Sequence, residues 1–416
     1  RGLGIQATYM SSQQNLTSAR AVYHELSKPN TFLKLLYVTP EGLGNTGGRL
    51  NSALQLLHSR KQLARFVIDE AHCVSTWGHD FRPDYKKLGA LRTAYPGVPV
   101  VALTATATTQ VQADIKKILK IPKCVVFQTS ANRPNLKFEV RPKKAKSKEG
   151  GALEELAEYI LQWGPRTTGI VYCLSRDECE GVSAFLGRSG ISADFYHAGM
   201  TPGQRAASQK AWQKGDVNVC VATIAFGMGI DKPDVRYVVH YSMPKAVESY
   251  YQEAGRAGRD SKLSHCVIYY APKDFGRVCK MLQKDLKARK NKTAYQKSIE
   301  HVEQMKAYCE EEIECRRGML LKHFGERSSG QSALGNADCG GSSGIEEPQG
   351  FMIPPCCDNC NWRACGGRPE ELRSFGGDGN ANKKRKRDEI NFYPGMHRQK
   401  GKGRGGWRGG KGRRVG

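Results

Sequence analysis

A short apolar run that ends in two carboxylates constrains the fold of this chain more than any other feature. Residues 66–68 are Phe-Val-Ile, and Asp69 and Glu70 follow them directly. A buried strand of a parallel sheet presents acidic side chains at its carboxyl end in this way, and that edge is where open α/β sheets bind ligands. Asp69 can hold Mg²⁺ on the phosphates of a nucleotide, and Glu70 can orient or deprotonate the attacking water. The same short pattern arises by chance in many proteins, so the residues around it decide its meaning.

The residues that follow the two acids, 73–83, mix aromatic, basic and polar side chains without a regular period. Such irregularity is typical of a loop. Trp77, Phe81 and Arg82 suit stacking on unpaired bases when a loop exposes them. We call residues 73–83 the aromatic loop.

The composition favours a nucleic acid as partner. The 416 residues suffice for two or three domains, and they carry a net charge of +25 with a pI near 9.5. An excess of basic side chains this large favours a polyanion. No apolar run reaches the ~18 residues of a transmembrane helix, no signal peptide is recognisable, and most cysteines are dispersed, as in a reducing compartment. A membrane partner is therefore not expected.

Short apolar strands alternate with helices along most of the chain, which predicts parallel βαβ units. In the first part we expect strands at 33–38, 66–68, 98–103 and 124–127, and helices at 11–27, 50–63 and 110–119. In the second part we expect strands at 169–173, 193–196, 217–222 and 237–241, and helices at 176–189, 202–213 and 245–255. The predicted fold class is α/β, with two doubly wound parallel-sheet lobes followed by charged helices at 272–288 and 294–323.

Two further strings suggest chemistry at the sheet edges. Gly-Arg-Ala-Gly-Arg at 255–259 places Arg256 and Arg259 three residues apart, a spacing that puts both side chains on one face of a helix. From there two guanidinium groups can reach the phosphates of a nucleotide held by the other lobe. By itself such a string is more often a solvated basic turn. Threonines at 104–108 end a predicted strand, where Thr104 can report on the nucleotide while Thr108 caps the next helix.

Six motifs in one order resemble those of the RecQ family of DNA helicases. Asp-Glu-Ala-His at 69–72 and the aromatic loop are similar to motif II and the aromatic-rich loop of that family, and Tyr-Gln-Glu-Ala-Gly-Arg-Ala-Gly-Arg-Asp at 251–260 resembles motif VI. Residues 37–41, 104–108, 170–173 and 222–231 resemble motifs Ib, III, IV and V. The resemblance extends over roughly residues 1 to 365.

The resemblance implies a two-lobed RecA-like motor that uses ATP and Mg²⁺ to move 3′ to 5′ along single-stranded DNA. Such a motor opens forked DNA in repair, recombination and replication in the nucleus; repair and replication proteins are candidate partners, and the oligomeric state stays open. The implied nucleotide-site residues are Asp69, Glu70, His72, Gly229, Asp231, Gln252, Arg256 and Arg259. The implied DNA-binding residues are Thr39, Trp77, His79, Phe81, Arg82 and Thr223.

The late cysteines predict a zinc site. Cys315 precedes two arginines, and Cys357 and Cys360 form a Cys-x-x-Cys pair, which fits four-thiolate Zn²⁺. The RecQ resemblance implies these three cysteines as ligands. For the fourth ligand we expect Cys339 rather than Cys356, because adjacent cysteines rarely bind one metal comfortably. A redox pair or unconnected thiols is the alternative.

We expect four segments: a first helicase lobe at 1–132, a second lobe at 133–275, a helical zinc-binding subdomain at 276–366 and a disordered basic tail at 367–416. From Lys383 onward thirteen Lys or Arg accompany two acids, so a net +11 of the +25 lies in the tail. Residues 383–387 are typical of a nuclear-import signal, and the Gly/Arg-rich end either binds strands or merely solubilises the chain. Only 51 residues follow Cys365, so we expect a short form without the winged-helix and helicase-and-RNaseD-type C-terminal domains.

The start of the chain bears on its activity. It begins with Arg1 rather than Met and contains no G-x-x-x-x-G-K-[ST] phosphate loop,. We therefore expect a helicase truncated at its N-terminus. Two alternatives stay open: a fragment that binds or anneals DNA without hydrolysing ATP, and an RNA helicase, which shares the Asp-Glu-Ala-His motor but is disfavoured by the aromatic loop and the cysteines.

Overall fold

The computed structural model describes residues 2–11, 14–43, 48–78, 80–145, 150–227, 230–289, 292–326 and 356–364. All of them belong to one compact unit, Arg1–Gly376. The tail expected at 367–416 lies outside the described residues, and so do His79, Gly229 and Cys339. Within the described ranges, every helix is too short or too polar to cross a membrane.

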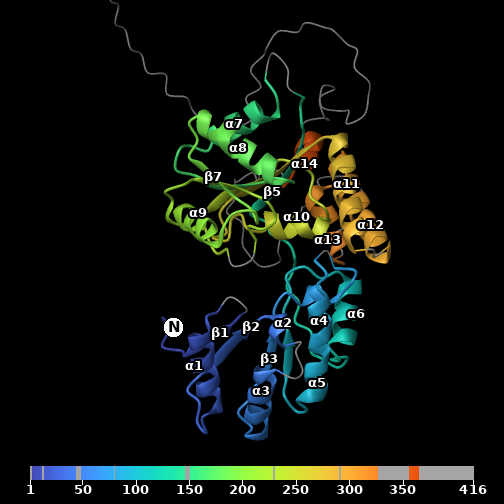
Figure 1. The fold of residues 1–416 in the computed structure, drawn as a ribbon. Helices are drawn as coiled ribbons and strands as arrows, with labels where there is room; N and C mark the ends of the chain where they lie inside the picture. The colour runs from blue at the N-terminus through green and yellow to red at the C-terminus, as the bar shows by residue number, and fades with distance from the viewer. Residues whose placement is uncertain are drawn as a thin grey trace, which may run out of the picture. The chain divides into compact units, whose positions relative to one another are not determined.

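In the described residues of the first lobe, four parallel strands form two pairs; Figure 1 labels β1, β2 and β3. β1 (Ala7–Met10) pairs with β2 (Leu35–Val38), and β3 (Phe66–Ile68) pairs with β4 (Val100–Ala102). The helices around them are α1 (Leu16–Ser27), α2 (Pro40–Leu43), α3 (Arg49–Ser59), α4 (Pro83–Lys87), α5 (Leu91–Ala94) and α6 (Thr109–Ile118), with short 3-10 turns at Ala71–Val74 and Leu88–Ala90. Thr108 caps α6, because its hydroxyl accepts from the Val111 N–H at 3.4 Å; the predicted cap is confirmed.

The second lobe is a six-stranded, wholly parallel sheet in the order β5-β10-β9-β6-β8-β7. The core lies on both faces of the sheet: Ile170 packs into one apolar cluster and the next residue, Val171, into the other. Strands buried on both faces are continuous apolar runs, as in β6 and β8,. The strands are β5 (Leu136–Pro142), β6 (Thr168–Tyr172), β7 (Ala193–Tyr196), β8 (Val219–Ala222), β9 (Val235–His240) and β10 (Ser264–Tyr270). The helices are α7 (Ala152–Leu161), α8 (Arg176–Arg188), α9 (Pro202–Lys214) and α10 (Val247–Ala254).

The structure differs from the local predictions at several elements. The strand predicted at 124–127 is wrong: this segment is irregular, and Phe127 is 93% exposed. A strand needs a neighbour for its backbone groups, and none of the described strands pairs with the segment. The strands β5 and β10 and the helix α7 were not predicted. β5 alternates apolar and charged residues, which is the pattern of a half-buried strand, and it pairs with β10 over its whole length.

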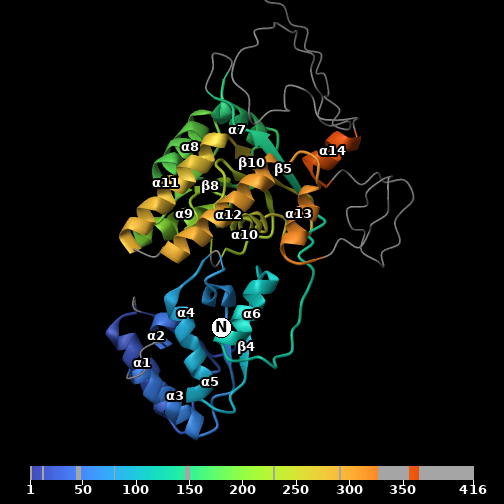
Figure 2. The same ribbon diagram turned by 90° about the vertical axis from the view of Figure 1, so that its right-hand side faces the viewer.

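A helical module of α11 to α14 follows the second sheet (Figure 2). α11 (Pro272–Arg289) and α12 (Lys292–Glu310) lie side by side, and α12 inserts Val302 and Met305 into the core beneath α10. The helix predicted at 294–323 is in fact two, since the chain turns at 311–315 before α13 (Arg316–His323). The turn is held from α14 (Asp358–Ala364), whose Asn359 amide donates to the carbonyls of Glu311 and Glu314 at 3.2 and 2.8 Å. The helical periodicity of residues 294–323 gives no indication of this contact.

Candidate active site and metal centre

Asp69 and Glu70 follow β3 immediately, as predicted, and the chain turns sharply there. Glu70 has φ 49° and ψ 43°, a left-handed conformation that is uncommon for a residue with a side chain. Its N–H donates to the Asp69 carboxylate at 2.9 Å, and the Ala71 N–H returns to the Leu103 carbonyl beside β4 at 2.8 Å. Non-glycine residues held in this region cluster at functional sites. The turn therefore holds both acids at the strand end.

Glu70 lies among groups from several motifs. The His72 ring nitrogen Nδ1 lies 3.3 Å from a Glu70 oxygen and 3.0 Å from the Thr104 hydroxyl, so His72 connects Glu70 to the first of the threonines after β4. The Gln252 amide, from α10, lies 3.4 Å from the other Glu70 oxygen. Partial burial and the neighbouring Asp69 raise the pKa of Glu70, while Arg256 opposes the rise. A carboxyl group with a raised pKa is better suited to accept a proton near neutral pH.

Arg256 and Arg259 lie beyond the end of α10, in the turn at 255–260, so the prediction that they share a helical face is wrong. α10 ends at Ala254, and Gly258 adopts φ 56°, which no continuing helix allows. Arg256 is buried and donates to the Gly227 carbonyl. Arg259 is more exposed and pairs with Asp231 at 3.0 Å. The two arginines therefore have separate partners on the loop that follows β8.

A cavity of about 1800 Å³ gathers most of the predicted site residues. Glu70 and His72 of the first lobe line it, and so do Thr223, Gln252, Arg256 and Arg259 of the second. Phe81 and Arg82 of the aromatic loop reach the same cavity, whereas Thr39, Asp69, Trp77 and Asp231 are absent from its lining. Gly229 and His79 lie outside the described residues. The lining combines carboxylates, among them Glu70, with several guanidinium groups, among them Arg256 and Arg259, which suits a phosphorylated ligand.

The aromatic loop lies against the helical module. Trp77 is 41% exposed, and the ammonium of Lys297 on α12 lies over its ring, 3.7 Å from the centroid. The same ammonium donates to the Thr76 hydroxyl at 3.1 Å. Arg82 pairs with Asp80 at 2.7 Å, and the Lys86 ammonium lies 5.0 Å from the Phe81 centroid. Lys297 was not foreseen, because a single lysine in a charged helix gives no signal of its partner.

Thr39 and Thr223 occupy strand ends, as predicted. Thr39 follows β2, and its carbonyl accepts from the Gly42 N–H at 3.0 Å at the start of α2. Thr223 follows β8, and its N–H donates to the Tyr196 carbonyl at 3.2 Å. Of the two, only Thr223 lines the cavity.

Four cysteines of the helical module converge: Cys315, Cys356, Cys357 and Cys360 lie with their sulfur atoms within 4.8 Å of one another. Cys356 thus occupies the position for which we expected Cys339, and Cys339 lies outside the described residues. The two adjacent cysteines both reach the cluster because the chain at this point bridges to Phe138 of β5 before α14 begins. Four thiols at this separation fit tetrahedral Zn²⁺.

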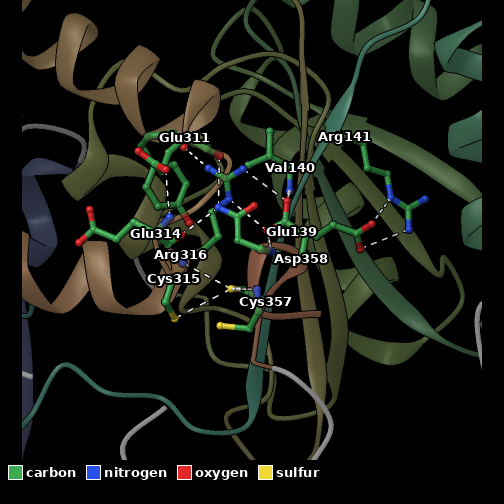
Figure 3. A network of polar contacts seen from close by, with 12 residues as sticks. Glu139, Val140, Arg141, Glu311, Glu314, Cys315, Arg316, Cys357 and Asp358 are labelled. Atoms are coloured by element: carbon green, nitrogen blue, oxygen red, sulfur yellow. Dashed lines mark hydrogen bonds and ion pairs between the residues drawn. The ribbon is translucent and has the colours of Figure 1, made fainter. Parts of the chain in front are cut away.

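The donors around the cluster also fit thiolate ligands. The N–H groups of Arg316 and Cys360 both point to the Cys357 sulfur at 3.4 Å, and N–H donors favour the ionised form of a thiol. Figure 3 shows how the cluster is tied to the sheet. Arg316, fully buried, donates to Asp358 at 3.1 Å, and the other Asp358 oxygen accepts from the Val140 N–H at 3.1 Å. The module is therefore anchored on β5.

Comparison with known proteins assigns each of these parts to a family. Residues 4–115 match the DEAD/DEAH box helicase family, residues 151–261 the helicase conserved C-terminal domain and residues 272–361 the RecQ zinc-binding family. The last match contains the four clustered cysteines.

Relatives that match most of the chain belong to the same kind of helicase. The chain is 47% identical over 327 residues to the RecQ-like DNA helicase BLM of Xenopus laevis, covering 78% of this chain and 24% of that protein. It is 48% identical over 334 residues to the RecQ-like DNA helicase blm-1 of Caenorhabditis elegans, covering 79% and 33%. The chain thus spans a quarter to a third of the length of these relatives. Among solved structures, the DUF1998 helicase MrfA bound to DNA is similar in fold, with a TM-score of 0.52 and 19% identity over 67% of this chain and 38% of that chain.

Proposed function

This chain belongs to the RecQ family of ATP-dependent DNA helicases, and from that premise we propose that it drives 3′ to 5′ movement along single-stranded DNA. The observation that carries the proposal is the cavity in which Glu70 and His72 of one lobe meet Gln252, Arg256 and Arg259 of the other. A site divided between two lobes can couple nucleotide hydrolysis to their relative motion. Forked DNA is the substrate we propose, in repair, recombination and replication in the nucleus.

The residues of the cavity have distinct proposed roles. Asp69 holds Mg²⁺, which neutralises charge on the phosphates when it is bound. Glu70 orients and deprotonates the attacking water, assisted by its raised pKa,. Arg256 and Arg259 stabilise the charge that develops on the phosphoryl group, a contribution typically worth ~10³–10⁵ in rate. Gln252 and His72 position Glu70 through the contacts at 3.4 and 3.3 Å.

The strand-binding surface is proposed to combine the aromatic loop with the threonines at the strand ends. Trp77 and Phe81 offer rings to unpaired bases, and Thr39 and Thr223 offer hydroxyls to phosphates. Cys315, Cys356, Cys357 and Cys360 hold Zn²⁺, which stabilises the helical module rather than taking part in catalysis,.

A second function deserves a test because the 416 residues contain no phosphate loop. That second function is to bind or anneal DNA strands without hydrolysing ATP. The experiment measures ATP hydrolysis by this chain, with and without single-stranded DNA, beside a form that carries a G-x-x-x-x-G-K-[ST] loop ahead of Arg1.

We expect hydrolysis only in the form with the loop, stimulated by single-stranded DNA. Hydrolysis by neither form, with DNA binding retained, would support the strand-binding or annealing function. Stronger stimulation by RNA than by DNA would support an RNA helicase instead. A DNA and an RNA oligonucleotide of the same length and sequence allow this comparison.

A further inference from the structure

Arg133 binds three backbone carbonyls that lie on both sides of Arg256. The residue lies in the segment that runs from α6 to β5 (Figure 2). Its guanidinium donates to the carbonyl of Gly255 at 3.3 Å, of Ala257 at 3.1 Å and of Gly258 at 2.9 Å. One rigid, planar group therefore holds the backbone immediately before and immediately after Arg256.

Asn135, two residues after Arg133, binds the same turn. Its amide donates to the carbonyls of Gly258 and Lys262 at 2.8 and 3.0 Å. Gly258 has φ 56°, and a Cβ there would lie 2.5 Å from the Asn135 amide nitrogen. The turn thus depends on a glycine in a left-handed conformation, which Asn135 packs against and whose N–H also donates to the Val235 carbonyl at 2.9 Å.

The buried side chain of Arg256 is held at its far end, where it donates to the Gly227 carbonyl and lies beside the Tyr172 hydroxyl. Its Nε is buried, and within the described part of the chain no hydrogen-bond partner faces it. The near end of the side chain starts from the backbone that Arg133 holds, so a shift of this backbone would move the guanidinium against its partners.

Arg133 also binds carbonyls of the turn that follows α10, which is a structural role in its own right. Two features indicate that Arg133 also influences Arg256. The carbonyls flank the one residue of the turn that is both buried and directed into the cavity. In addition, the preceding residue but one, Ala131, accepts from the Tyr251 hydroxyl on α10, so the connecting segment and the turn form one assembly.

We propose that Arg133 is a positioning residue for Arg256: it orients the turn so that the Arg256 guanidinium faces the phosphates. This inference rests on the proposed function, because it presumes that Arg256 acts on a bound nucleotide. Arg133 also lines the cavity, but its guanidinium donates to the three backbone carbonyls, and we assign it no contact with the reacting atoms. Since displacements of about 1 Å can cost ~100-fold in rate, loss of these contacts should act on the catalytic step.

The test uses the ATP-hydrolysing form that carries a phosphate loop. Arg133→Gln, Arg256→Ala and the double variant are compared for kcat, KM for ATP and thermal unfolding. We expect Arg133→Gln to lower kcat by about 10- to 100-fold with little change in KM. Arg133→Lys should not rescue, because an ammonium cannot span three carbonyls as a guanidinium does. On the Arg256→Ala background, Arg133→Gln should cost nothing further.

Arg60→Gln is the matched control, since Arg60 binds two backbone carbonyls, of Ser27 and Lys28, far from the cavity. It should leave kcat unchanged. An unchanged kcat in Arg133→Gln, or losses that add in the double variant, would overturn the inference. If Arg133→Gln does not fold, Arg133→Lys takes its place in the test: its kcat should fall, and the loss should vanish on the Arg256→Ala background. An inactive wild type would instead count against the proposed function, and an active Arg256→Ala against the role of Arg256.

Discussion

At the residue scale, Glu70 has the most unusual surroundings of the first lobe: a left-handed backbone, a raised pKa and a contact with Gln252. We expect Glu70→Gln, in a form that carries a phosphate loop, to bind DNA and nucleotide normally but to lower hydrolysis by at least ~100-fold. The amide keeps the shape and the hydrogen bonds but cannot accept a proton. Steady-state ATPase and DNA-binding assays measure the two effects separately.

Glu158→Gln, an exposed substitution of the same chemistry on α7, provides the control. It should retain wild-type activity. Persistent wild-type hydrolysis in Glu70→Gln would remove Glu70 from the proposed site.

At the scale of elements, the aromatic loop is held between the first lobe and α12. Lys297 covers one face of Trp77, and Phe81 reaches the cavity. We expect Trp77→Ala and Phe81→Ala to weaken the stimulation of ATPase by single-stranded DNA more than the basal ATPase. Each stacked base is worth ~1–3 kcal/mol, so the DNA concentration for half-maximal stimulation should rise by roughly 5- to 150-fold.

Phe32→Ala is a matched control for the aromatic loop. Phe32 is also an exposed ring of the first lobe with a lysine ammonium, that of Lys28, near its face. Its loss should leave the DNA dependence unchanged. Equal loss of basal and stimulated ATPase in Trp77→Ala would show that the loop supports the fold rather than sensing the strand.

At the scale of the whole molecule, the cysteine cluster joins distant parts of the chain. Cys315 ends the turn before α13, while Cys356, Cys357 and Cys360 lie some forty residues later and beside β5. We expect Cys360→Ser to lower bound zinc well below about one ion per chain and to lower the melting temperature, because structural zinc contributes folding energy directly. Metal analysis and thermal unfolding measure both.

The control is Cys279→Ser, on α11 and outside the cluster. It should bind zinc normally. An unchanged zinc content in Cys360→Ser would remove Cys360 from the proposed ligands, with Cys339 as the first candidate to replace it.

Local patterns predicted those parts of the fold whose cause is local. The strands at Ala193–Tyr196 and Phe66–Ile68 were predicted with their observed bounds, because a short stretch rich in apolar and aromatic residues defines each of them. The Thr108 cap depends on residues three positions apart. The parallel βαβ order of both lobes follows from the alternation of these runs with helices.

Tertiary contacts decided the rest. The break at 311–315 depends on Asn359, nearly fifty residues away, and the turn that takes Arg256 and Arg259 off the helix depends on Gly258, packed by Asn135. Neither the periodicity of the predicted helix at 294–323 nor the spacing of the two arginines can register these contacts. The apolar run at 124–127 failed as a strand for the converse reason, since its sequence favours a strand but no described strand pairs with it.

The sequence by itself determined that this protein has two parallel α/β lobes, a nucleotide-type carboxylate pair at a strand end and a cysteine-rich helical module. Only the tertiary structure decided that Cys356 completes the cluster, that Arg256 and Arg259 have separate partners and that Arg133 holds the turn between them. The physical reason is the range of the interactions. Strand and helix patterns are set by neighbours along the chain, whereas a sulfur, a guanidinium or a carbonyl finds its partner only where folding brings distant segments together.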